Sequence, residues 1–350
     1  SGWQVSVLAA GLGWGQIGTS LALDREGQGH ISFYDFTHDE NYGRLKYAHQ
    51  QPWGWTVDTV DVKLSAGGRT SIAIDQAGFA HISYFNYNLN QLRYAARSEQ
   101  GWQIQALASS PASQVGAHSS LALDAQDRPR IAFSDVLNQS LRYAYWDGGW
   151  HFETIDGQGT VGLDCSLALD AQERPHVSYS AGSGYALRFA YRDGGGWHTA
   201  TVDSERENST GTSLALDAGG LAHVAYLDFR DEANHLLKYA HRSDAGWQMG
   251  WIDSEDPVSG HISLALDPEG EAHLSYRSGS GLKYIYQDAS GWHDTVLDRE
   301  QYTGLYTSLA LDAAGYPHIS YCGPWPEHAL HYAFQDSAGW DLEVVQGKGM

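Results

Sequence analysis

The chain has few basic residues, almost no sulfur and no long apolar run. Lys and Arg number 21 against 42 Asp and Glu, which gives a formal net charge of −21. Phosphate backbones and anionic lipid surfaces are bound by clustered Lys and Arg, so we expect neither a nucleic-acid nor a membrane partner. No apolar stretch approaches the roughly 18 residues that a transmembrane helix needs.

Cysteine is nearly absent, because Cys165 and Cys322 are the only two. They lie far apart in the sequence and lack the paired spacing of a zinc motif, so we expect neither a zinc site nor a disulfide. Two cysteines leave the redox compartment open, and we favour an extracellular or periplasmic location.

Helical patterns are also missing, since no segment of about ten residues combines helical periodicity with capping residues. In their place stand 40 Gly, 13 Trp and 21 Tyr, while charged residues make up only 18% of the chain. A composition so rich in aromatic and turn-forming residues is typical of an all-β protein.

What the sequence does contain is an internal repeat. The pentapeptide Ser-(Leu/Ile)-Ala-(Leu/Ile)-Asp occurs seven times at a mean spacing of 48 residues, and Gly-Trp followed by an alternating segment occurs eight times. A fixed period of this length indicates a repeat architecture. The pentapeptides begin at Ser20, Ser71, Ser120, Ser166, Ser213, Ser263 and Ser308. The tryptophans of the second marker are Trp3, Trp55, Trp102, Trp150, Trp197, Trp247, Trp292 and Trp340.

Each copy of the repeat encodes four short strands. In the fourth copy they cover 166–170, 175–179, 187–191 and 196–202, and each is bounded by Gly, Asp or Pro. A lone four-stranded sheet leaves both faces wet, whereas radial stacking of seven such sheets buries them. We therefore predict an all-β fold, a seven-bladed β-propeller of four-stranded blades, that occupies 1–350 as a single domain.

The repeat separates scaffold residues from site residues, because seven identical active sites in one chain are implausible. A His opens the second strand in six copies, and Arg130 takes its place in the seventh. We interpret these His as structural groups that bond a turn carbonyl or a neighbouring Asp, and the recurring Trp as packing between outer strands. The six are His30, His81, His176, His223, His273 and His318.

The positions at which the copies differ indicate the site. The connections from the fourth strand to the next first strand, and from the second to the third, vary in length and chemistry. Binding is usually built on such loops, so we expect a site near the ring axis at the end where they meet. Two residues before the successive pentapeptides stand Gly18, Arg69, His118, Asp164, Gly211, His261 and Tyr306.

A second set of polar residues follows the second strand, and we predict that it joins the same axial site. These residues are Asp35, Asn86, Asp135, Asp228 and Arg277. The ligand-binding set is completed by Arg69, Asp164 and the loop aromatic Trp325. The candidate catalytic groups are His118, His261, Tyr306 and Arg277.

No cofactor is predicted. An axial metal ion stays open as an alternative, because His118, His261 and Asp164 are suitable ligand types, although they come from different repeats and lack a metal-binding spacing. The sequence contains no nucleophile elbow, no P-loop and no dinucleotide-binding fingerprint.

The string Ser-Leu-Ala-Leu-Asp-x-x-Gly-x-Pro-His-Ile-Ser-Tyr, best seen at 308–321, resembles repeats of bacterial seven-bladed propellers. Some of these belong to propeller-type polysaccharide lyases such as the ulvan lyases. The resemblance covers nearly the whole chain and rests on residues that recur in every blade, so it concerns the fold. It implies a His/Tyr acid–base pair with an Arg that neutralises a uronate carboxylate. Two sets of residues match these roles: Tyr306, His261 and Arg277, or His118 and Arg69.

Three functions stay open. The first is binding of a carbohydrate or other small polar ligand at the funnel mouth. The second is a lyase or hydrolase that acts on a saccharide or ester at the same axial site. The third is a protein-interaction platform. An enzyme predicts a deep axial pocket with His118 or His261 near a carboxylate or Tyr, whereas a platform predicts a broad exposed patch.

The eighth Gly-Trp marker needs a place in a ring of seven. Residues 1–8 have the pattern of a fourth strand that precedes the first blade, and 340–345 has the same pattern for the same edge of blade seven. We favour residues 1–8 as the closing strand. The alternatives are a displaced terminal segment or pairing with another chain, so the protein is expected to be a monomer or a strand-mediated dimer.

Overall fold

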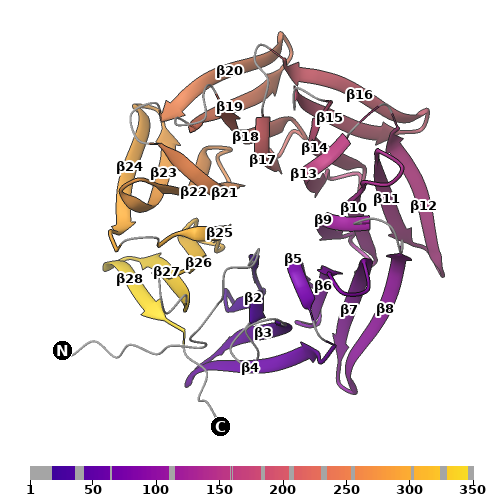
Figure 1. The fold of residues 1–350 in the computed structure, drawn as a ribbon. Helices are drawn as coiled ribbons and strands as arrows, with labels where there is room; N and C mark the ends of the chain where they lie inside the picture. Colours follow the sequence, from indigo (N-terminus) through magenta and orange to yellow (C-terminus); the bar gives the residue numbers. More distant parts are fainter. Residues whose placement is uncertain are drawn as a thin grey trace.

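Seven four-stranded antiparallel sheets surround a central axis in the computed structural model (Figure 1). Within each sheet the strands follow chain order, from the first strand at the axis to the fourth at the rim. The predicted seven-bladed β-propeller is confirmed. No helix that could cross a membrane occurs in the described part of the chain. The structure describes residues 18–35, 43–63, 65–109, 115–157, 159, 161–182, 186–204, 209–229, 235–253, 257–300, 303–323 and 329–345.

The four strand classes have these bounds in blades one to seven. The first strands are β1 (Thr19–Leu23), β5 (Ala66–Ile74), β9 (Val115–Leu123), β13 (Val161–Leu169), β17 (Ser209–Leu216), β21 (Val258–Leu266) and β25 (Leu305–Leu311). The second strands are β2 (Gly29–Asp35), β6 (Ala80–Asn86), β10 (Pro129–Asp135), β14 (Pro175–Ala181), β18 (Ala222–Phe229), β22 (Ala272–Ser278) and β26 (Pro317–Cys322). The third strands are β3 (Arg44–Gln51), β7 (Gln91–Ser98), β11 (Ser140–Trp146), β15 (Ala186–Asp193), β19 (His235–Ser243), β23 (Gly281–Asp288) and β27 (Leu330–Asp336). The fourth strands are β4 (Gly54–Asp61), β8 (Gly101–Ser109), β12 (Trp150–Asp156), β16 (Gly196–Asp203), β20 (Gly246–Asp253), β24 (Gly291–Asp298) and β28 (Gly339–Val344).

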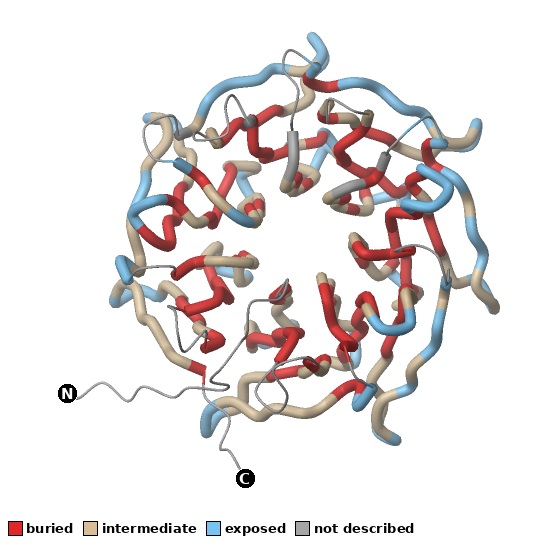
Figure 2. Tube along the Cα trace, in the orientation of Figure 1, coloured by how far each residue is buried: buried red, intermediate tan, exposed pale blue. Residues whose placement is uncertain are grey.

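The core lies between neighbouring blades. Alternate residues of a strand face opposite sides of its sheet, and a propeller blade has a neighbour on each side. The second strands are therefore buried along their length, whereas much of the rim strands is exposed (Figure 2). One core cluster shows the arrangement, since it combines Leu45 and Tyr47 of blade one with Ile72, Ile82 and Tyr84 of blade two.

One tryptophan of each fourth strand packs on the preceding blade. Trp102 meets the third-strand Tyr47 of blade one edge-on, with ring centroids 5.3 Å apart. The same contact recurs at every junction and includes Trp55 of blade one on Tyr332 of blade seven, at 5.0 Å. The predicted packing role is confirmed for these seven tryptophans. Trp3 lies outside the described residues.

The recurring His are scaffold residues, as predicted. In blade one, the Tyr47 hydroxyl donates to His30 Nδ1 at 2.5 Å, and His30 Nε2 donates to Asp24 at 3.2 Å. Asp24 also accepts the backbone N–H of Glu26 and Gln28 and so closes the turn between first and second strands. Burial lowers the pKa of all six His, which keeps these imidazoles neutral at pH 7.

A buried carboxylate joins several neighbouring blades. Asp61, which ends blade one, accepts the hydroxyl of Tyr84 at 2.7 Å and the guanidinium of Arg93 at 2.5 Å, both from blade two. The contact recurs with the Asp residues that end blades three, four and six. At the two junctions where the Tyr is replaced by Phe33 or Phe133, the carboxylate is also missing, because Val345 and Ala108 stand in its place.

The first-strand serines join the blades at the axis. Each Ser Oγ accepts the backbone N–H of an apolar residue in the next blade, and the bond from Leu21 N to Ser308 Oγ closes the circle at 3.0 Å. The pairs are Ser20–Ile72, Ser71–Leu121, Ser120–Leu167, Ser166–Leu214, Ser213–Leu264, Ser263–Leu309 and Ser308–Leu21. The outer edge of blade seven is formed by β28. The predicted closing strand, residues 1–8, lies outside the described residues.

Candidate functional site

The variable residues that precede the pentapeptides lie at irregular places in the first strands. In blades two to seven the pairing between first and second strand shifts register there. Arg69, Asp164 and Tyr306 have φ angles of 46°, 50° and 55°, and Gly211 has 63° at the equivalent position. A left-handed backbone costs a non-glycine residue on the order of 1 kcal/mol. Arg69, Asp164 and Tyr306 adopt this backbone at equivalent positions of their blades, where glycine would avoid the cost. This indicates that their side chains have a role that glycine could not fill.

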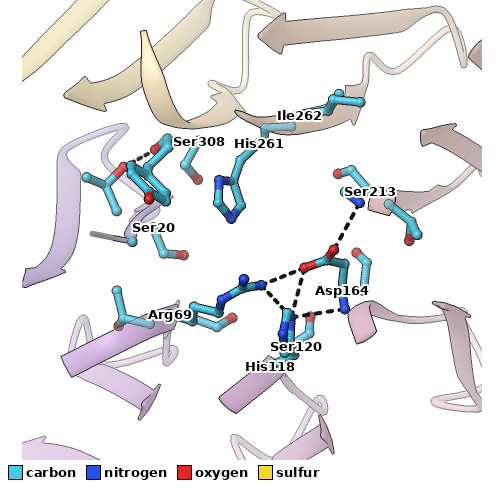
Figure 3. Close-up of a pocket in the computed structure, with 18 of the residues that line it drawn as sticks. Ser20, Arg69, His118, Ser120, Asp164, Ser213, His261, Ile262 and Ser308 are labelled. Carbon is cyan, nitrogen blue, oxygen red and sulfur yellow. Dashed lines mark hydrogen bonds and ion pairs between the residues drawn. The ribbon is translucent and has the colours of Figure 1, made fainter. Parts of the chain in front are cut away.

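These residues surround an axial cavity of about 200 Å³ (Figure 3). Every blade contributes its pentapeptide serine and the two residues before it. Five residues of the predicted site line this cavity: Arg69, His118, Asp164, His261 and Tyr306. Bulges next to an axial opening re-aim side chains, which explains how neighbouring strands bring these groups together.

Three of these side chains form one cluster across blades two, three and four. Arg69 Nη1 donates to Asp164 Oδ1 at 2.6 Å and also contacts His118 Nδ1. His118 Nδ1 lies 2.8 Å from Asp164 Oδ1 and 3.0 Å from the Asp164 backbone N. Nδ1 of His118 can either donate or accept a hydrogen bond, depending on whether it carries a proton. With a proton it donates to the carboxylate, and without one it accepts from Arg69 and the amide.

Asp164 is held in its charged form. Burial raises the pKa of its carboxyl group, but the hydrogen bond from His118 and the charges of His118 and Arg69 outweigh burial and hold the pKa well below its usual range. The second oxygen, Oδ2, accepts the backbone N–H of Gly211 at 3.2 Å. The carboxylate thus joins blade four to blades two, three and five, and its charge is offset by Arg69.

His261 and Tyr306 face each other on the opposite wall. Their ring centroids are 4.6 Å apart, and Figure 3 shows the His261 ring projecting toward the space next to Arg69. Burial, together with the nearby charge of Arg69, lowers the pKa of His261 to about 4, so the ring is neutral at pH 7. Its Nδ1 is buried and makes no hydrogen bond with the described residues.

The cluster does not fit the alternative of an axial metal ion. Arg69 places a cationic donor 2.6 Å from the Asp164 oxygen that a metal would need. In the part of the chain that the structure describes, no group of three or more His, Cys, Asp and Glu side chains could hold a metal ion.

Four residues of the second predicted set lie at or next to the ends of second strands and do not line the cavity. Asp35 lies 3.9 Å from Lys46, Asp135 accepts Asn138 Nδ2 at 2.8 Å, and Asp228 lies 3.1 Å from Lys238. Asn86 Oδ1 accepts the backbone N–H of Leu89 at 2.9 Å. These buried groups contact turn residues or third-strand cations and lie outside the axial cavity.

Arg277 also lies outside the cavity wall. It pairs with Ser259 in β21 and is one residue earlier in its strand than Asp35 and its equivalents, so it projects from the opposite face of the sheet. Burial raises the pKa of the Cys322 thiol in blade seven to about 12, and the charge of Arg277 partly offsets this rise. The cation of the axial cavity is Arg69. Trp325 falls outside the described residues.

We did not predict from the sequence that Ser and Thr hydroxyl groups form a circle around the cavity. A Ser or Thr stands between the variable residue and the pentapeptide in five blades and pairs with a second-strand Ser, for example Thr70 with Ser32 at 2.7 Å. In the other two blades the place is taken by Cys165 and Ile262, and the partner is Ala. Cys165 is a free thiol whose pKa burial raises to about 12, so it replaces a hydroxyl and is not a nucleophile. The recurrence of both serines was visible in the sequence.

Comparison with known proteins identifies the architecture. No model of a known protein family matches the chain, and no curated protein matches it. A protein from Lactobacillus plantarum is 11% identical, with 92% of this chain and 98% of that chain covered and a TM-score of 0.60. The fucose-specific lectin from Aleuria aurantia is 13% identical, with coverages of 82% and 97% and a TM-score of 0.56. AofleA from Arthrobotrys oligospora is 12% identical, with coverages of 99% and 89% and a TM-score of 0.56. At these identities the likeness concerns the fold.

Proposed function

We propose that the protein binds a carbohydrate or another small polar ligand in the axial cavity. The observation that carries this proposal is that Arg69, His118 and Asp164, from three different blades, contact one another in the cavity. They occupy equivalent positions in their blades, and blades one and five have glycine at that position. Packing does not require such a mixed polar cluster. Its charged and neutral donors and acceptors suit a ligand with several hydroxyl or carboxyl groups.

The size and lining of the cavity favour a single sugar ring over a larger molecule. Its volume of about 200 Å³ is below the roughly 300–1,000 Å³ typical of sites for drug-sized ligands. The pentapeptide serines already accept backbone amides through Oγ, and each hydroxyl keeps its proton to donate. Solved propellers of this general shape include a fucose-specific lectin and the SapL1 lectin in complex with alpha methyl fucoside, which makes saccharides the first class to test.

Ligand-detected NMR of the whole chain provides the test. We would mix the protein with methyl glycosides of fucose, galactose and glucose, and with glucuronic acid, and measure saturation transfer. At least one compound should bind, and Arg69→Gln and Asp164→Asn should each weaken binding about tenfold or more, because each leaves a buried polar partner unpaired. His198→Ala, on the exposed rim of blade four, is the control and should change nothing. Binding that neither axial variant alters would refute the axial site.

A second candidate function is a lyase or hydrolase at the same cavity. It is favoured by the His261–Tyr306 pair near Arg69, which provides the residue types that the propeller-type lyases use. A His with a pKa of about 4 is a weak general base at neutral pH, and for this reason binding is our first proposal. Uronate polymers and generic esters would be assayed with wild type, His118→Ala and His261→Ala. Turnover that both variants abolish would establish catalysis, and no turnover by wild type would exclude these substrates.

A further inference from the structure

A second cavity lies between blades two and three and shares no residue with the axial cavity. It measures about 320 Å³, and its walls include Tyr94 and Ala96 of blade two and Trp146 and Trp150 of blade three. The equivalent cleft between blades one and two measures about 340 Å³. Similar clefts therefore lie at two neighbouring blade junctions, and they differ in the side chains that line them.

One wall of the cleft departs from the repeat at Ala96. In the other six blades this third-strand position carries a ring that in several cases stacks on the blade's own aromatic residue, as His49 does on Tyr47 at 5.4 Å. The equivalents are His49, Tyr145, Tyr191, His241, Tyr286 and Phe334. Ala96 has only a methyl group, so no ring at this position stacks on Tyr94, and the ring that blade two places next to Tyr94 is His81, at 5.9 Å. This part of the wall therefore has a methyl group where other blades have a ring, although the cleft as a whole is no larger than its neighbour.

The facing wall departs from the repeat at Trp146. In the other six blades the equivalent residue is Gln or Arg, and in the neighbouring cleft Arg97 lies over the Tyr47 ring at 5.2 Å. The equivalents are Gln50, Arg97, Arg192, Arg242, Gln287 and Gln335. Trp146 instead contacts Trp150 edge-on, with ring centroids 5.7 Å apart. The cleft between blades two and three therefore has an aromatic wall where its neighbour has a guanidinium.

Polar groups complete the lining of this cleft. Gln103, Gln105, Gln126 and Asp127 are all in its wall. Trp150 Nε1 donates to Gln105 Oε1 at 3.0 Å, which fixes the amide and leaves its NH₂ group to donate elsewhere. Asp127 Oδ1 accepts the backbone N–H of Gln76 at 3.1 Å, so one oxygen of an anchored carboxylate remains as an acceptor.

We propose that this cleft is a second saccharide-binding site, in which a sugar ring lies against Trp146 and next to Ala96. The carbon face of a pyranose is apolar and matches an indole surface, while its hydroxyl groups need side-chain amides and a carboxylate at the edge of the ring. Gln103, Gln105 and Asp127 provide those groups. The two departures from the repeat lie in one cleft: Trp146 supplies an aromatic surface, and Ala96 places a methyl group where the other blades place a ring.

Two variants restore the residues of the other blades and so should preserve the fold. Trp146→Gln removes the aromatic surface and introduces the residue of blades one, six and seven, and Ala96→Tyr replaces the methyl group with the residue of blades three, four and six. Arg242→Gln, at the position equivalent to Trp146 in blade five, is the matched control.

Saturation-transfer NMR with the methyl glycosides of fucose, galactose and glucose, and indole fluorescence during the same titrations, would measure binding. We expect at least one glycoside to bind wild type and Arg242→Gln equally, and to bind both cleft variants about tenfold less tightly or worse, as expected for loss of an aromatic anchor. Arg69→Gln should leave this binding intact, which separates it from the axial site. The proposal is overturned if no glycoside binds, or if binding to the Arg69→Gln protein, whose axial site is weakened, survives both cleft changes.

Discussion

Ser308 Oγ accepts the backbone N–H of Leu21 at 3.0 Å, although the two residues are 287 positions apart in the sequence. This bond joins the last blade to the first. The equivalent serine of each other blade makes the equivalent bond at the six other junctions. At the rim, Trp55 packs on Tyr332 as its counterparts do elsewhere. The ring therefore closes with the contacts that it uses between all other blades.

Replacing Ser308 with Ala should destabilise the protein by about 1–3 kcal/mol, because the Leu21 N–H loses its partner at the one junction that the chain does not bridge covalently. Urea denaturation followed by fluorescence would measure the change. Ser290→Ala, in an exposed turn of blade six, is the control and should stay within about 0.5 kcal/mol of wild type. A Ser308→Ala variant with an unchanged unfolding midpoint would show that closure does not depend on this bond.

Much of the fold was predictable from the sequence because scaffold positions recur. The seven pentapeptides gave the number of blades, and six recurring His were correctly separated from the site because each has an equivalent in other blades. Closure was harder to predict, because one serine in one copy gives no sign of its partner. The partner of Ser308 is identified only when the structure places blade seven next to blade one.

The site was predictable in part. Arg69, His118, Asp164, His261 and Tyr306 share one sequence position, and the structure places all five in one cavity. Arg277 was predicted to join the site because it follows Tyr276 of the second strand. It lies one position earlier in its strand than Asp35 does, and a shift of one residue turns a side chain to the other face of the sheet. The position of Asp35, Asp135 and Asp228 outside the cavity was not predictable, because the sequence does not reveal their contacts with Lys46, Asn138 and Lys238. Left-handed backbone angles, which mark the axial residues, are also invisible before the structure.

Replacing Asp61 with Ala should cost about 3–5 kcal/mol of stability, because Arg93 would keep a buried charge without a partner. The double variant Asp61→Ala/Tyr84→Phe should be less destabilised than the sum of its single variants, since the Tyr hydroxyl and the carboxylate satisfy each other. Chemical denaturation of the four proteins in this cycle gives the coupling energy. Simple additivity would show that the two groups act independently.

Stability should fall when the pH is lowered from 7.5 to 5.5. Burial lowers the pKa of the six recurring His below the value of 6.5 that they have when unfolded. At a pH between the folded-state and unfolded-state pKa values of these His, the unfolded chain binds more protons than the folded chain. Their contribution to the free energy of unfolding is therefore complete above pH 6.5 and is lost as the pH falls toward the folded-state pKa values. Each His contributes up to about 1.4 kcal/mol per pH unit in that window. Urea midpoints at pH 8.5, 7.5, 6.5 and 5.5 would test this, and equal midpoints at 7.5 and 5.5 would contradict it.

Phe189→Tyr should stabilise the protein, whereas the chemically identical change Phe133→Tyr should destabilise it. In five blades a Tyr hydroxyl donates to the Nδ1 of the recurring His, but in blade four Phe189 leaves His176 Nδ1 buried without a partner among the described residues. The ring separation of 5.7 Å between His176 and Phe189 is close to the 5.9 Å of His30 and Tyr47, so the added hydroxyl has room and should gain about 0.5–1.5 kcal/mol.

Phe133 is fully buried and occupies the place of the Tyr residues that donate to the carboxylate of the preceding blade. At its junction Ala108 offers no acceptor, so a hydroxyl there would be buried unpaired at a cost of about 1–3 kcal/mol. Thermal and urea unfolding of both variants measures the two effects side by side. If both changes shifted stability in the same direction, hydrogen-bond satisfaction would not be what decides between Tyr and Phe in these blades.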